Sequence, residues 1–233
     1  MPMAEPGATG IPKIERHLAA IVAADVAGYA RLMERDEART VERLGRYLNE
    51  LIEPLIAERN GRIAKLTGDG LVCAFASVVE AAAFAVALRD AVAERERDLP
   101  PEDRIRLRIG IDVGDIVRSG DDIHGNGVGI AAGLKELAEP DGICVSAKVH
   151  EEVREELAVG FQPLGSRRGG NIAQPVEVWR VLPSGAVGDA RFRVARRSLR
   201  VGPARAAAVA LGGLVAAGAG GWWWWQAQTE PAT

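Results

Sequence analysis

The chain has 233 residues, of which 48% are hydrophobic and 26% charged, enough for one well-buried domain and an appendage. Its formal net charge of −3 hides an asymmetry, because the part from Asp189 onward contains six arginines and only two acids. The rest is correspondingly acidic, which argues against a general nucleic-acid-binding protein. Cys73 and Cys144 lie in short apolar runs without metal-ligand spacing, and we expect buried free thiols in a reducing compartment.

The first half of the chain predicts strands and helices in alternation. The run HLAAIVAADVAGYA, which begins at His17, is typical of a buried strand that ends in a turn. GRIAKLTGDGLVCAFAS predicts a β-hairpin, and the capping-box spacing of Ser77 and Glu80 predicts the start of a helix. In chain order, the predicted elements after the first strand are a helix over residues 36–59, a hairpin turn at 67–70 and a long alanine-rich helix that ends near Arg95.

The second half continues this alternation. RIRLRIGIDVGDIV predicts a strand, a tight turn at Gly114–Asp115 and a second strand. The later predicted elements are a helix over 128–137, a strand over 143–145, a helix over 147–157 and short strands over 160–164 and 175–182. Strands separated by helices, with two hairpins among them, indicate an α+β sandwich of the ferredoxin-like kind.

The helix predicted over 128–137 has an unusual composition. Its apolar face is expected to consist of Val128, Ala131, Ala132, Leu134, Leu137 and Ala138. Gly129 and Gly133 lie four residues apart and therefore on one side of this helix. Because each glycine costs about 1 kcal/mol relative to alanine in a helix interior, the sequence raises the question of which side chains are missing there.

The C-terminal part differs in composition from the rest. Residues 206–225 contain no charge, end in four tryptophans and follow a basic segment, which predicts a single transmembrane helix. A disordered Ala/Gly tail is the alternative. The arginines would keep the large domain on the cytoplasmic side of the cytoplasmic membrane. The predicted organisation is a disordered leader (1–15), a catalytic-type domain (16–182), a basic linker (183–205), the membrane helix (206–225) and a tail (226–233).

Two carboxylates stand beside glycines where strands end. Asp25 ends the first strand and Asp69 occupies the hairpin turn. If these strands are neighbours, both carboxylates emerge at one sheet edge, a donor set that suits Mg²⁺ and leaves positions open for phosphate oxygens. The turn Val26–Ala30 would offer backbone N–H groups to phosphates, with Gly28 permitting a close approach. The alternative is that Asp25 caps a helix and Asp69 merely fills a turn position.

Several blocks resemble, in order, the class III adenylate/guanylate cyclase catalytic domain: AADVAGYARLME, GRIAKLTGDGLVCAF, RIRLRIGIDVGDI and DDIHGNGVGIAAGLKELAEPDGICVS. The resemblance runs from about His17 to Val181. It implies the cyclase sandwich fold, conversion of ATP to cyclic AMP and pyrophosphate, and a homodimer with sites at the subunit interface. It also implies two Mg²⁺ or Mn²⁺ ions per site, held by Asp25, Asp69 and the carbonyl of Val26.

The same resemblance implies substrate contacts. Lys65 and Asp122 match the purine-reading positions of the adenylate-specific type, and Gly28, Tyr29 and Ala30 match the phosphate turn. A lysine can donate to adenine N1 and a carboxylate can accept from the exocyclic amine, whereas guanine reverses this donor pattern. Without the resemblance, Lys65 is a solvent-facing strand lysine and Asp122 a turn residue.

The chain departs from the family at the positions that stabilise the transition state. Where the family helix carries an asparagine for the ribose and an arginine for the phosphate, this chain has Gly129 and Gly133. Gly170 stands in the usual place of a triphosphate-binding lysine, although Arg167 and Arg168 are close in sequence. Ala30 likewise replaces the family's serine or threonine. Losing one preorganised donor typically lowers turnover by about 10²–10³, so activity is expected to be low.

Three functions remain open on the sequence. The first is a membrane-tethered adenylate cyclase of low activity, or one completed as a heterodimer with a paralogous cyclase domain. The second is a catalytically degenerate ATP-binding or dimerisation module that acts as a signalling partner. Gly129 and Gly133 favour the second function, whereas the first is favoured by Asp25, Asp69, Lys65 and Asp122. A third is a phospho-acceptor role for Asp25, as in receiver domains, which the ordered blocks disfavour.

Overall fold

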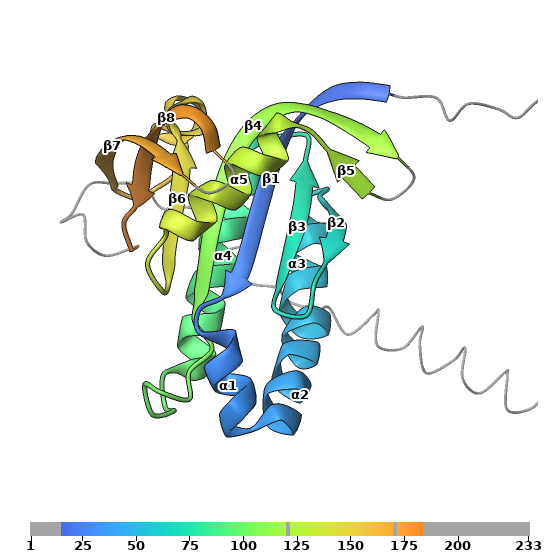
Figure 1. The fold of residues 1–233 in the computed structure, drawn as a ribbon, viewed down its shortest axis with the longest axis vertical. Helices are drawn as coiled ribbons and strands as arrows, with labels where there is room; N and C mark the ends of the chain where they lie inside the picture. The colour runs from blue at the N-terminus through green and yellow to red at the C-terminus, as the bar shows by residue number, and fades with distance from the viewer. Residues whose placement is uncertain (1–14, 120–121, 170–171, 184–233) are drawn as a thin grey trace, which may run out of the picture. The chain divides into compact units, whose positions relative to one another are not determined.

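The apolar run that follows His17 is buried on both of its sides. In the computed structural model, which describes residues 15–119, 122–169 and 172–183, this run forms the central strand β1 (Glu15–Val26) (Figure 1). Ala20 and Val22 pack into a core on one face of the sheet, and Ala19 and Ile21 pack into a core on the other. A strand covered on both faces needs apolar residues without alternation, which is the pattern seen here.

The sheet is mixed. Its strands follow the order β2-β3-β1-β4-β6-β8-β7, and β5 pairs with the end of β4. The β4–β6 pair is parallel, and the other pairs are antiparallel. The remaining strands are β2 (Arg62–Leu66), β3 (Gly70–Phe75), β4 (Leu107–Ser119), β5 (Asp122–His124), β6 (Gly142–Ser146), β7 (Phe161–Gly169) and β8 (Ile172–Val181).

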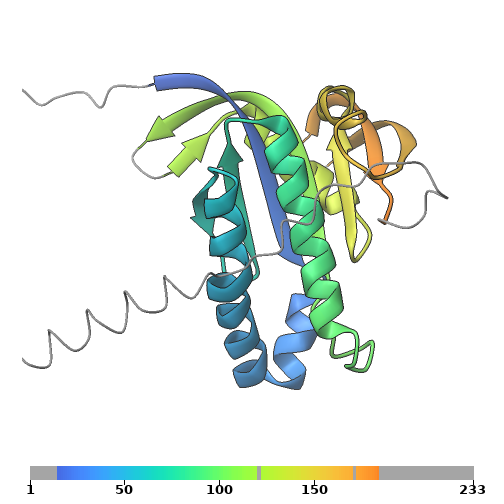
Figure 2. The same ribbon diagram turned by 180° about the vertical axis from the view of Figure 1, so that it is seen from behind.

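Helices cover both faces of the sheet (Figures 1 and 2). The long helix α4 packs on one face, and α5 lies on the opposite face against β4 and β1. The described helices are α1 (Tyr29–Arg35), α2 (Glu37–Tyr47), a π-helical turn η1 (Leu48–Ile52), α3 (Glu53–Glu58), α4 (Val78–Glu96), α5 (Asn126–Leu137) and α6 (Ala147–Val153). The predicted α+β architecture is confirmed, and the structure adds that its sheet is mixed.

Several local predictions are confirmed. The TGDG turn joins β2 to β3 as expected, and the side chain of Ser77 caps α4 by accepting from the backbone N–H of Glu80 at 3.3 Å. The helical region predicted over 36–59 forms as α2, η1 and α3 in direct succession. Cys73 and Cys144 are buried free thiols, and burial raises the pKa of Cys144 to about 11.

The turn predicted at Gly114–Asp115 is wrong. β4 runs without interruption from Leu107 to Ser119 and pairs with β1 along that length. Gly114 has another role, because a Cβ built on it would lie 3.4 Å from the Cα of Gly127 in α5. Gly114 therefore faces the start of α5, where Gly127 is the tightly packed residue, because a Cβ built on Gly127 would lie 2.9 Å from Cδ1 of Ile21. Local sequence does not distinguish a glycine inside a strand, next to a helix, from a turn signal. The hairpin that follows instead joins β4 to β5, a strand that was not predicted.

Other differences are smaller. The helix α1 was not predicted, α6 ends at Val153 rather than near 157, and Leu137 of the expected apolar face is 37% exposed. The leader 1–14 and residues 184–233, which include the predicted membrane helix, lie outside the described residues. Among the helices that the structure describes, none is both long enough and apolar enough to cross a membrane.

A buried polar cluster joins α2, α4 and the segment before β4. Glu96 is 2% exposed, and its carboxylate accepts hydrogen bonds from Arg43, Tyr47 and the backbone N–H of Ile105. Arg43 also donates to the carbonyl of Asp103 at 3.0 Å. The donors that converge on Glu96 offset the cost of burying its charge and fix the approach of α2 to α4.

Candidate functional site

Asp25 lies where β1 ends, and its carboxylate is almost fully engaged by cations. Arg108 donates through Nε to Oδ1 at 2.9 Å and through a terminal nitrogen to Oδ2 at 2.8 Å. Lys135 approaches Oδ2 from α5, also at 2.8 Å. The side chain of Asp25 is 7% exposed, against 31% for Arg108 and 21% for Lys135. A desolvated carboxylate is thus balanced by two half-buried cations.

Strand register and helix docking produce this arrangement. Arg108 is directly opposite Asp25 in the antiparallel β1–β4 pair. Two residues further along β4, a Cβ built on Gly110 would lie 2.1 Å from the carbonyl oxygen of Ala131 and 2.3 Å from the backbone nitrogen of Lys135. The backbone of α5 therefore rests directly on the strand at Gly110, which brings Lys135 within reach of Asp25.

Asp69 lies beside Asp25, in the turn between β2 and β3. Its backbone carbonyl accepts a hydrogen bond from the N–H of Val26 at 2.9 Å, and its Oδ1 accepts one from the Thr67 hydroxyl at 3.3 Å. Gly70 is opposite Asp25 in the register, and a Cβ there would lie 2.4 Å from the carbonyl oxygen of Ala24. The glycine is therefore required for the turn to approach the end of β1.

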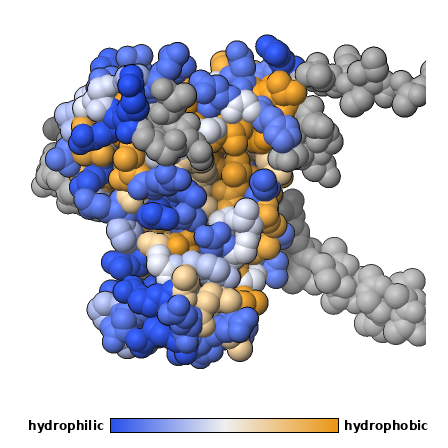
Figure 3. All heavy atoms as spheres, viewed as in Figure 1, coloured by the Kyte–Doolittle hydropathy of each residue, from blue (hydrophilic) through white to orange (hydrophobic). Residues whose placement is uncertain are grey.

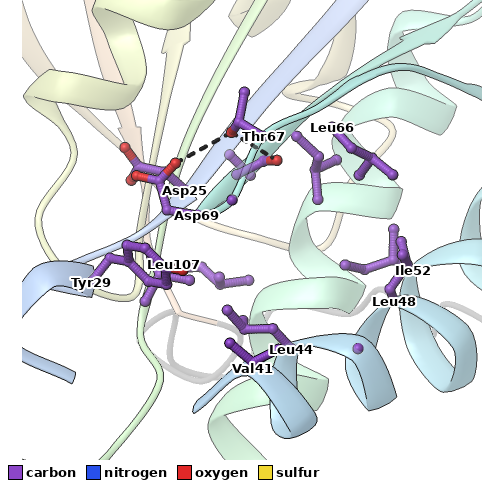
Figure 4. Close-up of a pocket in the computed structure, with 16 residues that line it drawn as sticks. Asp25, Tyr29, Val41, Leu44, Leu48, Ile52, Leu66, Thr67, Asp69 and Leu107 are labelled. Carbon is purple, nitrogen blue, oxygen red and sulfur yellow. Dashed lines mark hydrogen bonds between the residues drawn. The ribbon is translucent and has the colours of Figure 1, made fainter. Parts of the chain in front are cut away.

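Asp25 and Asp69 line one cavity of about 280 Å³ (Figure 4). Its polar end is formed by these carboxylates with Tyr29 and Thr67, as Figure 4 shows. The rest of the wall is apolar and comes from α2, η1 and neighbouring strands, namely Val41, Leu44, Leu48, Ile52, Leu66 and Leu107. The fold thus brings both carboxylates together at one edge of the sheet, as the sequence predicted.

The donor set fits a divalent cation. Two carboxylates and the adjacent carbonyl of Val26 are hard oxygen ligands, and two carboxylates with open positions are what Mg²⁺ or Mn²⁺ uses when it also binds phosphate. Within the described residues, no group of three or more His, Cys, Asp or Glu side chains suits a metal, so these two carboxylates would depend on further oxygens from a ligand. Arg108 and Lys135 occupy both oxygens of Asp25, so a metal ion would compete with them for this carboxylate.

The predicted phosphate turn follows β1 directly. Gly28 has a φ of +69° in the left-handed region, which favours glycine, and it precedes the first residue of α1, Tyr29. Tyr29 is half-buried and faces the cavity, while Ala30 is exposed. The N–H of Ala27 donates to the carbonyl of Arg106 at 2.8 Å and holds the turn against the segment before β4.

The predicted purine-reading residues lie on strands next to each other. Lys65 is exposed in β2, and Asp122 begins β5, which contacts β2 (Figure 1). Lys65 does not line the cavity that contains Asp25 and Asp69. Within one chain, Lys65 therefore lies outside the cavity that the two carboxylates line.

The two unexpected glycines lie on α5. Gly133 is buried and Gly129 half-buried, in a helix whose Ala131 and Leu134 are packed against the sheet. Gly170, in the place of the family's lysine, lies outside the described residues, whereas Arg167 and Arg168 are exposed in β7.

Sequence reasoning missed Arg108 and Lys135. Arg108 belongs to the alternating run RIRLRIG. Lys135 follows Ala131 by four residues, so Ala131 and Lys135 lie on the same side of α5, the side that meets Gly110. The pattern shows which residues share a face, but it does not show which residue of β1 they meet, because that depends on register.

Comparison with known proteins gives a consistent result. The family described as "Adenylate and Guanylate cyclase catalytic domain" matches residues 13–166. The protein named "Putative adenylate cyclase 3" of Rhizobium meliloti (strain 1021) is 43% identical over 170 residues, which are 73% of this chain and 29% of that protein. An adenylate cyclase of Streptomyces coelicolor is 31% identical over 140 residues, which are 60% of this chain and 35% of that protein. The chain thus spans about a third or less of the length of these relatives.

Solved structures agree. The crystal structure of an adenylate/guanylate cyclase/hydrolase from Silicibacter pomeroyi is 43% identical with a TM-score of 0.69, and the match covers 73% of this chain and 99% of that one. The adenylyl cyclase CyaB from P. aeruginosa, at 19% identity and a TM-score of 0.64, matches over 77% of this chain and 97% of its own and shares the fold.

Proposed function

Because the chain belongs to the adenylate and guanylate cyclase catalytic domain family, we propose that it is an adenylate cyclase that converts ATP to cyclic AMP and pyrophosphate. One observation carries the proposal. Asp25 and Asp69, from different strands, line the same cavity beside the turn that begins at Gly28. This is the donor set that a metal-bound triphosphate needs.

We propose that Asp25, Asp69 and the carbonyl of Val26 hold two Mg²⁺ or Mn²⁺ ions. The bound ions would supply activation of the ribose 3′-hydroxyl and neutralisation of the triphosphate. Gly28 to Ala30 form the turn that follows β1 directly, and Tyr29 lines the same cavity. The backbone N–H groups of this turn would orient the phosphates.

The choice of ATP over GTP rests on Lys65 and Asp122. A lysine donor and a carboxylate acceptor complement the adenine edge, whereas guanine would leave both groups unpaired. Their strands are in contact, which supports a shared role in binding one base. Since Lys65 lies outside the cavity of the carboxylates within one chain, the proposal includes a partner chain that brings its base-reading surface to the carboxylates of this one.

A dimer is therefore part of the proposal, as a homodimer or a heterodimer with a paralogous cyclase domain. Large apolar side chains are exposed at Leu18, Val41 and Leu66. Figure 3 shows apolar residues gathered over the middle of one face of the domain, with mostly hydrophilic residues over the lower helices. Exposed apolar surface of this kind is typical of an interface.

A second candidate function is a half-site partner. With Gly129 and Gly133 on α5, the chain offers no side chain at the two positions where the family has transition-state residues, while it retains Asp25 and Asp69. A heterodimer in which a paralogue supplies the asparagine and arginine would have one working site. This alternative predicts metal-dependent ATP binding without turnover by the chain alone.

The proposed location is the cytoplasmic membrane, with residues 206–225 as anchor and the cyclase domain in the cytoplasm. Fractionation of cells that express the full chain and a chain that ends at residue 205 tests it. The anchor is supported if only the full chain sediments with membranes and resists extraction at high salt.

The function is tested by incubating the purified full chain with Mn²⁺ and either ATP or GTP and measuring both cyclic nucleotides. The proposal predicts cyclic AMP in excess of cyclic GMP and none of either from Asp69→Ala. Cyclic GMP as the main product would overturn the assigned specificity. Binding of Mn²⁺ and ATP without product would favour the half-site function, and Gly129→Asn with Gly133→Arg should then create activity.

A further inference from the structure

We propose that Lys135 is a phosphate-positioning residue of this site, held on Asp25 until metal and nucleotide enter. This inference rests on the proposed function and deepens it. Lys135 belongs to the same chain as the carboxylates that are proposed to bind metal. No sequence pattern assigned Lys135 a role, and its position follows from the packing of α5 on β4.

The two carboxylates at the end of the cavity are matched by two cations. Asp25 and Asp69 are the carboxylates of the cavity, and Arg108 and Lys135 are the cations in contact with Asp25. Both cations meet Oδ2, so this oxygen has two charged donors at 2.8 Å. A metal ion on Asp25 would compete with them, because metal and cations share the lone pairs of one carboxylate and repel each other, and displacement of one cation relieves this repulsion.

Lys135 is the easier of the two to displace. Arg108 is held by a two-point contact with both oxygens, whereas Lys135 makes a single contact at the end of a flexible four-carbon stem. The base of that stem is fixed, because the backbone nitrogen of Lys135 lies against Gly110. A released ammonium group therefore stays near the cavity, where the triphosphate would be the nearest uncompensated anion.

The position of Lys135 also bears on what the helix lacks. Gly133 leaves α5 without a cationic side chain at that position, and Lys135 is the next basic residue along the helix. Its side chain points to the carboxylate of its own chain, as the ion pair shows. Lys135 thus offers the site a phosphate-directed charge that needs no partner chain.

If Lys135 has this role, Lys135→Gln should strengthen the binding of metal alone and weaken the binding of nucleotide. Lys135→Gln removes a competitor of the metal, so Mn²⁺ alone should bind the full chain about three-fold more tightly or better. The same variant loses a charged donor to the phosphates, so Mn²⁺ with α,β-methylene-ATP should bind about ten-fold more weakly. Lys135→Arg, which keeps the charge, should restore nucleotide binding. Titration calorimetry of the full chain measures both affinities.

Lys148→Gln is the matched control, because it removes the same charge from α6, and Lys148 does not contact Asp25. It should change neither affinity by more than about two-fold. If Lys135→Gln weakens the binding of metal and of nucleotide alike, or alters neither, Lys135 has only a structural role and the inference is wrong. If the unaltered chain binds neither Mn²⁺ nor the analogue, the proposed function fails as well, so the two failures are distinguishable.

Discussion

Asp25 and Arg108 face each other across the β1–β4 pair and form a two-point ion pair, with contacts of 2.9 and 2.8 Å. The carboxylate in this pair is almost fully buried, and the guanidinium is about one-third exposed. The residue proposed to bind metal is therefore already held in place by the fold. Asp69, by contrast, lies on a turn and is held by a neutral hydroxyl.

This difference predicts unequal effects on stability. Asp25→Asn should lower the free energy of unfolding by about 1 kcal/mol, because it leaves Arg108 and Lys135 without a counter-charge while both retain some access to water. Asp69→Asn should change it by less than about 0.5 kcal/mol. Urea unfolding of both variants without metal measures the effects. If Asp25→Asn lowers the free energy of unfolding no more than Asp69→Asn does, the ion pairs of Asp25 do not contribute to stability.

The contact between α5 and β4 predicts that Gly110 cannot be enlarged. Gly110→Ala would force its Cβ into the backbone of Ala131 and Lys135, and should lower the free energy of unfolding by about 3 kcal/mol. Gly45→Ala in α2 is the matched control, because a Cβ there meets nothing within 4 Å. It should stabilise the protein by up to about 1 kcal/mol through helix propensity. A well-tolerated Gly110→Ala would contradict the docking geometry.

Asp112 predicts a dependence of stability on pH. The residue is 2% exposed, its Oδ2 has no hydrogen-bond partner among the described residues, and burial raises its pKa despite the nearby Ser146 and Lys148. A raised pKa means that the ionised form costs stability at neutral pH, a cost that disappears as pH falls below the pKa of the folded state. Asp112→Asn should therefore stabilise by about 1 kcal/mol at neutral pH.

The gain from Asp112→Asn should shrink on acidification, when the native carboxyl group becomes neutral as well. Thermal unfolding of the native chain and the variant over a series of pH values measures the difference. A gain that stays constant, or grows, towards acid pH would mean that Asp112 is not destabilising when ionised.

The cluster around Glu96 predicts a large loss from one substitution. Glu96→Ala leaves the buried Arg43 without its counter-charge and the N–H of Ile105 without its acceptor, and should cost about 3–5 kcal/mol. Tyr47→Phe removes a single hydrogen bond to the same carboxylate and should cost about 1 kcal/mol. Chemical denaturation compares the two. Similar small losses would show that Arg43 is paired elsewhere.

The features that sequence predicts well here are local. The hairpin at Thr67–Gly70 and the cap at Ser77 depend on residues within four positions of each other, and both form as expected. The proximity of Asp25 and Asp69 required only that each lie at the end of a strand in adjacent positions of the sheet. Local sequence motifs therefore predict individual strands, turns and helix starts, and they indicate the edge of the sheet at which a strand ends.

What sequence could not predict depends on how elements pack. Gly114 is typical of a turn, but it lies inside β4 and faces Gly127 at the start of α5. The contacts of Asp25 with Arg108 and Lys135 require both the register of β4 on β1 and the docking of α5 at Gly110. Register and docking are set by tertiary contacts, so no short motif contains them.

Metal-dependent cyclic AMP formation by the full chain tests the central claim most directly. With saturating Mn²⁺ and ATP, we expect slow formation of cyclic AMP by the native chain, and none above background with Asp25→Asn or Asp69→Asn. Formation of cyclic AMP that persists in both variants would contradict the claim that these two carboxylates, brought together at the ends of their strands, form the metal site.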